Sequence, residues 1–380
     1  MDLDLSTEQQ MLRDSLREFC EAEVGTGVVR AAEQDPAIGM NVAKRLAELG
    51  VTNLRIPADL GGSGLGLTEL AVAYIELGRA LAPGPHFECG VVSAGLLARL
   101  SDPVARELLA GIAAGERWII TAWQERENRI DLPSMQAATR REGGRILIDG
   151  EKHFVPYARF ADRLLVPAAH PDRPMHRVIC VVDPSARGIE FVAQPNLADE
   201  PLMRLRFTGT PVEALLGADE DVTSAWESAF QECLVAMAAL AAGGAERILE
   251  ITTKYACERE QFGKPIGAFQ AIAHYLADAA VQVEGARTLV YRAASAADDG
   301  DPFRHFALMA KLKACATFRS VSATAIQVHG GLGFTLEADP QLYYRRAKHQ
   351  QLMYGDPAWL ECRIADGLFA GTHPHPIFDL

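Results

Sequence analysis

Two runs of glycine are the first residues whose types and spacing suggest chemistry. Gly61-Gly-Ser-Gly-Leu-Gly66 and His329-Gly-Gly-Leu-Gly333 could each bring bare backbone close to a phosphate. Neither run fits G-x-G-x-x-G or G-x-x-x-x-G-K-[ST], and neither lies in a predicted βαβ unit. From the residues alone, the first indicates a surface turn. The second indicates glycine-rich backbone at the end of a helix, with close approach of a flat or charged ligand as the alternative.

The seven cysteines indicate neither a metal site nor a disulfide framework. No two of them form a C-x-x-C pair, and none lies at metal-ligand spacing from a histidine. We expect buried, reduced thiols, which are typical of a reducing compartment. The cysteines are Cys20, Cys89, Cys180, Cys233, Cys257, Cys315 and Cys362.

Length and charge limit the classes of protein to consider. A chain of 380 residues is too long for one ordinary core and predicts two or three domains. Its net charge of -13 repels nucleic acid and anionic membrane surfaces, so we expect no nucleic-acid partner. The acidic N-terminus has no signal-like apolar segment, and the apolar stretch Leu234–Ala245 is too short to cross a bilayer. The sequence therefore predicts a cytoplasmic protein without a membrane span.

Three regions of different periodicity must position any site. Residues 1–116 carry apolar positions at helical spacing, and residues 222–380 form long alanine-rich runs with few breakers, which favour a helical bundle. Residues 117–221 contain short β-prone runs separated by Pro, Gly and Asp. The patterns predict a multidomain α+β fold, with an N-terminal helical domain, a central antiparallel β domain and a C-terminal helical bundle.

Within the β region, Arg145–Val155 consists of two β-prone runs around Asp149-Gly150. Because Asp-Gly favours a two-residue turn, this pattern predicts a β-hairpin. Short strands without intervening helices also predict an antiparallel sandwich or barrel. Further strands are predicted at Leu164–Val166, Val178–Val182 and Ile189–Val192.

Three segments resemble signature segments of the acyl-CoA dehydrogenase family. They are Leu49–Gly66, Tyr255–Gln270 and Ile326–Glu337, the last continuing to Tyr343–Lys348, and they follow the family's order over almost the whole chain. The resemblance implies the family's three-part fold with a C-terminal four-helix bundle and a FAD between subunits. It also implies α,β-dehydrogenation of an acyl-CoA or another acyl thioester, with electrons passed to a flavin electron acceptor.

The resemblance places one group of residues beside the ADP part of a FAD held mainly by a neighbouring subunit. An arginine offers a charged fork to a pyrophosphate, and paired glycines permit close approach. From the residues alone, this arginine would instead form a surface salt bridge with Glu258 or Glu260. The group comprises Arg259, Gln261, Phe262, Phe269, Gln270, Gln327, Gly330 and Gly331.

The family's contacts to the flavin ring are not matched. The resemblance aligns Trp123–Asp131 with a TEP…GSD segment, in which Glu125 matches the glutamate but the small serine loop is absent. The family's aromatic-Ile-Thr trio corresponds here to Phe154-Val155-Pro156. Because proline has neither a hydroxyl nor an N–H, the resemblance implies that the threonine's hydrogen bond to the ring is lost.

The reaction also needs a base, which removes the proton beside the thioester carbonyl while hydride leaves the β-carbon. At the two positions where the family has its glutamate, this chain has Cys233 and Tyr354. Tyrosine, with a reference pKa of about 10, is a poor base at neutral pH. The neighbouring carboxylates Glu232 and Asp356 are the remaining candidates, and we expect both to be solvated or structural.

This division resembles the partner chains of heterotetrameric family members that act on pimeloyl-CoA or sterol side chains. In those assemblies one chain carries the base, and its partner has lost its own site. The resemblance therefore predicts a hetero-oligomer with a related dehydrogenase subunit. A homo-oligomer, a self-sufficient flavin enzyme with a displaced base, and a scaffold without flavin stay open as alternatives.

Overall fold

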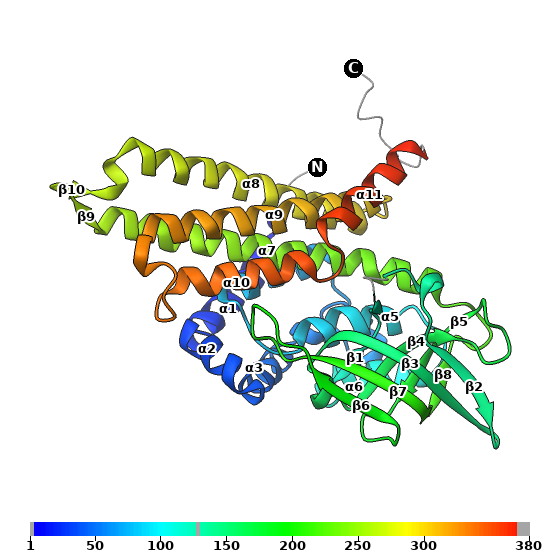
Figure 1. Ribbon diagram of the computed structural model, residues 1–380. Coiled ribbons are helices and arrows are strands. Elements are labelled where there is room, and N and C mark those ends of the chain that lie inside the picture. Colours follow the sequence, from blue (N-terminus) through cyan, green and yellow to red (C-terminus); the bar gives the residue numbers. More distant parts are fainter. Residues whose placement is uncertain (1–3, 127–129, 371–380) are drawn as a thin grey trace. The chain divides into compact units, whose positions relative to one another are not determined.

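The computed structural model describes residues 4–126 and 130–370, which divide into two compact units (Figure 1). We call Met1–Val29, Gly66–Ala82 and Leu234–Leu380 the helical unit, as far as these ranges are described. We call Arg30–Leu65 and Pro83–Cys233 the mixed unit. The expected order of a helical N-terminal part, a central sheet and C-terminal helices is confirmed. The three boundaries at residues 1–116, 117–221 and 222–380 stay a prediction.

The helical unit is built from helices far apart in the sequence. A Cβ on Gly243 would lie 1.9 Å from the carbonyl oxygen of Ile75, so glycine allows α4 and α7 to approach at the backbone. The carboxylate of Asp298 accepts hydrogen bonds from the N–H groups of Leu67 and Thr68, at 2.6 and 2.8 Å, and so caps the first turn of α4. The helices are α1 (Thr7–Glu23), α4 (Leu67–Ala80), α7 (Thr223–Glu258, shared with the mixed unit), α8 (Gln270–Asp298), α9 (Arg304–His329), α10 (Asp339–Leu352) and α11 (Pro357–Phe369).

The mixed unit combines short helices with a sheet. Its α6 buries one apolar face, and the six residues of η3 form a π-helix, a rare element that is common near functional sites. The helical elements are α2 (Thr26–Gln34, which begins in the helical unit), α3 (Pro36–Glu48), η1 (Val51–Asn53), η2 (Ala58–Leu60), η3 (Glu88–Ser93), α5 (Ala94–Leu97), α6 (Pro103–Ala113), η5 (Leu132–Ser134) and η6 (Ala158–Phe160).

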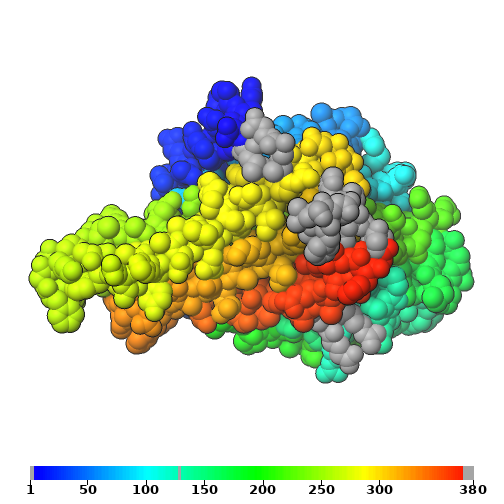
Figure 2. Space-filling model, turned by 90° about the horizontal axis from the view of Figure 1, so that it is seen from above, coloured from blue at the N-terminus to red at the C-terminus, as the bar shows by residue number. Residues whose placement is uncertain are grey.

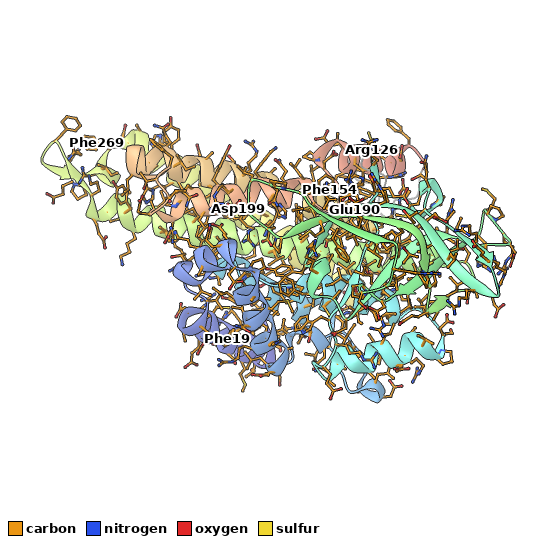
Figure 3. All side chains as sticks on the ribbon, turned by 60° about the horizontal axis from the view of Figure 1, so that its bottom comes forward. Phe19, Arg126, Phe154, Glu190, Asp199 and Phe269 are labelled. Carbon is orange, nitrogen blue, oxygen red and sulfur yellow. The ribbon has the colours of Figure 1, made fainter. Side chains whose placement is uncertain are left out.

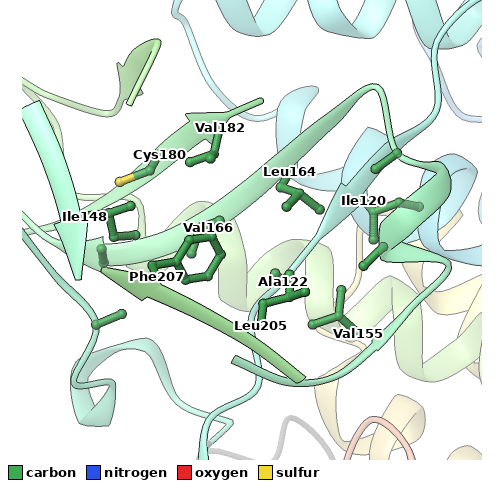
Figure 4. Close-up of a cluster of buried hydrophobic side chains, with 14 of the residues drawn as sticks. Ile120, Ala122, Ile148, Val155, Leu164, Val166, Cys180, Val182, Leu205 and Phe207 are labelled. Carbon is green, nitrogen blue, oxygen red and sulfur yellow. The ribbon is translucent and has the colours of Figure 1, made fainter. Parts of the chain in front are cut away.

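Among the described residues, eight strands form one sheet, mostly antiparallel as predicted. The order is β6-β7-β3-β2-β4-β5-β8, with β1 also pairing with β4; the contacts of β1 and β2 with β4 are parallel. Figure 4 shows the core on this sheet, where Ile148, Val166 and Phe207 pack together. The strands are β1 (Ile119–Thr121), β2 (Ala138–Glu142), β3 (Arg145–Pro156), β4 (Arg163–Ala169), β5 (Arg177–Val182), β6 (Ile189–Ala193), β7 (Leu202–Pro211) and β8 (Ala214–Leu216).

The predicted hairpin at Asp149-Gly150 is wrong, because β3 runs through this dipeptide without turning. The turn lies earlier, between β2 and β3, where Glu142 pairs with Arg145. Gly150 has φ +146°, and a Cβ there would lie 2.8 Å from the Cα of Ala137. The β3–β7 register shifts at this glycine, so the dipeptide forms a β-bulge instead of a turn.

The expectation of buried cysteines is confirmed only in part. No helix of the described residues is long and apolar enough to cross a membrane, and the same residues contain no cluster that could hold a metal ion. All seven cysteines are free, and five are buried as expected. Cys257, near the end of α7, and Cys362, on α11, are exposed instead.

Candidate flavin-contact site

The residues expected at the ADP side gather mainly where α7 turns into α8. A short ribbon of β9 (Glu260–Gln261) and β10 (Lys264–Pro265), followed by η7 (Ile266–Ala268), makes this turn. We call residues 259–270 the arm tip. Figure 3 labels Phe269 there, and in Figure 2 the yellow-green atoms of the tip extend beyond the orange atoms of α9 and α10. The tip is therefore open to a second molecule.

Side chains of the arm tip are exposed and make few bonds of their own. Phe262 is 93% exposed and has φ +55°. Its ring centroid lies 6.2 Å from that of Phe269, whose ring also carries the ammonium of Lys264 at 4.2 Å. Among the described residues, Arg259 has no ion-pair partner, so the salt bridge with Glu258 or Glu260 does not form. The arginine therefore keeps all its side-chain donors for a ligand.

The second group of ADP-side residues lies at the end of α9. The helix ends at His329, and Gly330 follows with φ +61°. A Cβ on Gly330 or Gly331 would meet no atom within 4 Å, and both glycines are exposed. Gln327 is exposed in the last turn of the helix. The segment thus presents bare backbone that a ligand can approach closely.

The two groups are joined by a pair of rings with no role in the sequence-based expectations. Tyr255, in the last turn of α7, stacks on His329 with ring centroids 4.1 Å apart and an interplanar angle of 20°. The carbonyl oxygen of Tyr255 also accepts a hydrogen bond from the N–H of Arg259 at 2.8 Å. The sequence offered one signal for this link between Tyr255 and Arg259. The tyrosine stands four residues before the arginine, a spacing that brings two residues together on a helix.

The trio Phe154-Val155-Pro156, which corresponds to the family's flavin-ring contact and which we call the ring side, ends strand β3 in the mixed unit. Pro156 is buried and lies opposite Leu202 on β7. Phe154 sits in a register shift with φ +53°, and its N–H donates to Oε1 of Gln194 at 2.7 Å. The proline thus offers no donor to a ligand, and the N–H of Phe154 is already bonded within the chain.

Gln194 belongs to a chain of side chains that sequence reasoning missed. Its Nε2 lies 3.4 Å from Nδ1 of His153, and Nε2 of that histidine lies 2.8 Å from the carboxylate of Glu151. Arg206 donates to the same carboxylate at 3.1 Å. Burial raises the pKa of Glu151, but the hydrogen bonds with Arg206 and His153 outweigh it, so this pKa lies below its usual value. These polar side chains of the sheet thus find their hydrogen-bond partners within the same chain.

Glu125 in the TEP-like segment is also fully engaged. It pairs with Lys152 at 2.8 Å and accepts hydrogen bonds from the N–H groups of Gln136 and Ala137, at 2.6 and 3.0 Å. Burial raises the pKa of this carboxyl, but the lysine charge and the backbone donors outweigh it, so the pKa of Glu125 lies below its usual value. Residues 127–129 of the segment, including Arg129, lie outside the described residues.

Glu232, a candidate base, is held between two arginines of the mixed unit. Its Oε1 lies 2.6 Å from Arg55 and 2.8 Å from Arg99, and the residue is 7% exposed. Arg55 also donates to the carbonyl oxygen of Leu65, and Arg99 to that of Gly95. This carboxylate ties a loop and a helix end to α7. Its geometry supports the structural role that the sequence suggested.

The other two candidates lie in the turn before α11. Tyr354 is 2% exposed with φ +55°, so its hydroxyl is enclosed by the helical unit. Asp356 is the N-cap of α11, where its carboxylate accepts from the N–H of Trp359 at 2.8 Å. The buried ammonium of Lys311 donates to the carbonyl oxygens of Gln351 and Gly355 and so fixes the turn. Asp356 caps a helix, and a catalytic role of Tyr354 stays a prediction.

The residues fit one half of a FAD and not the other. The exposed, unpaired Arg259 and the open backbone of Gly330 and Gly331 fit a pyrophosphate and its nucleoside. On the ring side, Pro156 offers no hydrogen bond and the N–H of Phe154 is taken by Gln194. The described residues therefore fit the ADP half of the cofactor and leave the ring half without these partners.

Comparison with known proteins covers most of the chain. Residues 6–116 match the model of the acyl-CoA dehydrogenase N-terminal domain, and residues 224–369 match that of the C-terminal domain. Benzylmalonyl-CoA dehydrogenase of Aromatoleum aromaticum is 30% identical over 382 residues, covering 96% of this chain and 99% of that protein.

Solved structures agree over nearly the full length. The steroid acyl-CoA dehydrogenase Tcur3481-Tcur3483 superposes with a TM-score of 0.84 at 28% identity, covering 96% of this chain and 98% of that one. The ChsE4-ChsE5 complex from Mycobacterium tuberculosis gives a TM-score of 0.85 at 25% identity, covering 99% and 100%. The resemblance seen in the motifs is thereby confirmed, and the chain belongs to the acyl-CoA dehydrogenase family of FAD-binding oxidoreductases.

Proposed function

We propose that this chain is a partner subunit in a hetero-oligomeric acyl-CoA dehydrogenase. It supports the ADP half of a FAD whose ring is held by a related subunit, and it supplies no base of its own. The observation that carries the proposal is the contrast between the unpaired Arg259 at the arm tip and the engaged Glu232 and proline-ended trio of the mixed unit. When bound, FAD supplies the hydride acceptor for α,β-dehydrogenation of an acyl thioester.

The chain's own residues would bind and orient the cofactor. The guanidinium of Arg259 donates to pyrophosphate oxygens in a planar fork. The bare backbone of Gly330 and Gly331 lets the nucleoside approach without a Cβ in the way. The rings of Phe262 and Phe269 exclude water from the tip. Gln261, Gln270 and Gln327 offer amide groups to the same ligand.

A related subunit is the partner that the surface favours. Four large apolar side chains near the cofactor contacts are at least half exposed, which is typical of a surface that another chain covers. Both solved structures compared above are named as pairs of chains. A hetero-oligomer would bury this patch while keeping the proposed cofactor contacts between subunits. The four side chains are Phe262, Leu332, Phe334 and Leu336.

Two alternatives are separable from this proposal. A self-sufficient flavin enzyme with a displaced base would use Glu232, but that carboxylate is already bound by Arg55 and Arg99. A scaffold without flavin would have no use for the unpaired Arg259. We also propose, from the acidic net charge and the family membership, that the protein acts in the cytoplasm with a flavin electron acceptor.

The visible spectrum of the purified chain tests the proposal. The chain is expressed alone and together with the related subunit that co-purifies with it, and bound FAD is measured by flavin absorbance. We expect a nearly colourless chain alone and a yellow complex with fewer flavins than chains. Stoichiometric FAD in a homo-oligomer would favour the self-sufficient enzyme, and no flavin in either preparation would favour the scaffold.

A further inference from the structure

We infer that the stacked rings of Tyr255 and His329 are a positioning pair, which sets the spacing between Arg259 and the Gly330–Gly331 backbone. Through this spacing the pair determines how firmly the chain holds the ADP half of a flavin. The inference rests on the proposed function, because that function supplies the ligand. Neither ring needs to touch the cofactor.

On one side, the backbone of Tyr255 anchors the start of the arm tip. Its carbonyl oxygen accepts from the N–H of Arg259 at 2.8 Å, and the carbonyl oxygen of Arg259 accepts from the N–H of Ile266 at 2.8 Å. These two bonds place the first residue of the tip against the last turn of α7 and close the β9–β10 ribbon over it. A displacement of Tyr255 therefore displaces the arginine.

On the other side, His329 is the last residue of α9 and directly precedes the glycines. Its Nδ1 donates to the carbonyl oxygen of Ala325 at 2.8 Å, which fixes the ring orientation. Gly333 folds back against it, since a Cβ there would lie 3.0 Å from the Cβ of His329. The ring position thus defines where the glycine backbone begins.

The stack connects these two fixed points across segments far apart in the sequence. With centroids 4.1 Å apart and planes inclined by 20°, the rings face each other closely. A ligand that bonds to both Arg259 and the glycines requires their separation to be held within about 0.5 Å. A stack between the two helix ends meets this requirement, whereas an aliphatic contact would allow the ends to slide.

The rival explanation is that the stack is ordinary packing. Packing alone predicts that loss of the ring lowers the unfolding midpoint and leaves FAD affinity unchanged. Phe306 provides a matched control, because it is a half-buried aromatic at the opposite end of α9, with the guanidinium of Arg292 4.4 Å from its ring centroid. Its replacement removes an aromatic contact from the same helix without touching either cofactor segment.

The test compares four variants in the purified complex with the related subunit. Tyr255→Leu removes the ring, Tyr255→Phe keeps it, Phe306→Leu is the control, and Arg259→Ala is the reference for direct contact. For each, the FAD dissociation constant is measured by the fluorescence of released flavin, and the unfolding midpoint is measured separately. We expect Tyr255→Leu to weaken FAD about threefold to tenfold, with Tyr255→Phe and Phe306→Leu close to the parent.

The outcomes distinguish a failure of the positioning pair from a failure of the proposed function. If Arg259→Ala weakens FAD and Tyr255→Leu does not, the positioning pair is wrong and the proposed function stands. The pair is also wrong if Tyr255→Phe or Phe306→Leu weakens FAD as much as Tyr255→Leu. If Arg259→Ala leaves FAD unchanged, or no preparation retains FAD, the proposed function fails as well.

Discussion

The arm tip of the helical unit and the ring-side strand of the mixed unit differ in whether their polar groups are bonded within the chain. At the tip, Arg259 and the backbone of Gly330 are exposed, and no described residue forms an ion pair with the arginine. On the ring side, neighbours of the same chain occupy the carboxylate of Glu125 and the N–H of Phe154. Exposed groups that only water can bond are available to a partner molecule, whereas buried groups bonded within the chain contribute to the fold. The contrast separates contacts for another molecule from contacts for the chain itself.

The largest expected effect is on the ring side, at the buried pair of Lys152 and Glu125. Lys152 is fully buried, and its replacement in Lys152→Met would leave the carboxylate of Glu125 buried without its counter-charge. We expect the free energy of unfolding to fall by about 3–5 kcal/mol. Denaturant unfolding followed by tryptophan fluorescence measures this loss. The double variant with Glu125→Gln should recover part of it, and full additivity of the two losses would contradict the pairing.

Arg259→Ala tests the opposite side of the comparison. Loss of a charged hydrogen bond to a ligand costs about 1.5–3 kcal/mol, so FAD affinity of the assembled complex should fall tenfold or more. Stability of the chain should change little, because the arginine has no ion pair to lose. Titration of FAD into the stripped complex measures the affinity. Arg287→Ala is a suitable control, since that half-buried arginine on α8 pairs with Glu284 away from the tip.

Glu232→Gln asks whether the enclosed carboxylate has a structural or a chemical role. The change weakens two charged hydrogen bonds, with Arg55 and Arg99, and we expect a stability loss of about 1–3 kcal/mol. The rate of acyl-CoA oxidation per bound flavin should stay within a few-fold of the parent complex. Removal of a general base costs about 10²–10⁴ in rate. A loss of that size with FAD retained would show that this chain has a working site.

The smallest effects are expected in the turn before α11. Asp356→Ala should lower the stability of the chain by about 0.5–2 kcal/mol, because the N-cap of the helix is lost. Asp356→Asn, which can still cap, should lie near the parent. Tyr354→Phe should leave acyl-CoA oxidation within a few-fold. A large rate loss in Tyr354→Phe with FAD and fold preserved would point to tyrosine chemistry and would overturn the half-site proposal.

The sequence predicted the order of the fold well, because long alanine-rich helices and short β-prone runs separated by Pro, Gly and Asp leave clear patterns. It failed at Asp149-Gly150, since the same dipeptide suits a turn and a bulge, and only the neighbouring Ala137 and β7 decide between them. On α8, Tyr275 lies at helical spacing from the buried Ala279 and Val283 but is itself exposed, because periodicity does not show where packing stops.

The candidate site was only partly predictable for a similar reason. The motifs predicted Arg259 and the glycines. They predicted neither the hydrogen bond between Phe154 and Gln194 nor the ion pairs of Glu232 with Arg55 and Arg99. These contacts join residues far apart in the sequence, and no local pattern records them. The side chains that satisfy a site internally therefore became visible only in the structure.

The discontinuous helical unit has a consequence for the order of events during synthesis. Helix α4 lies in the same unit as α7, which reaches the helical unit only at Leu234, and Asp298 caps its first turn from still further along. A ribosome adds about 5–20 residues per second, so α4 waits roughly ten seconds or more for its packing partner. During that interval α1 can already cover part of α4, but the surface of α4 that packs on α7 stays exposed. The nascent chain is then most prone to aggregation, and chaperone binding during this interval would protect it.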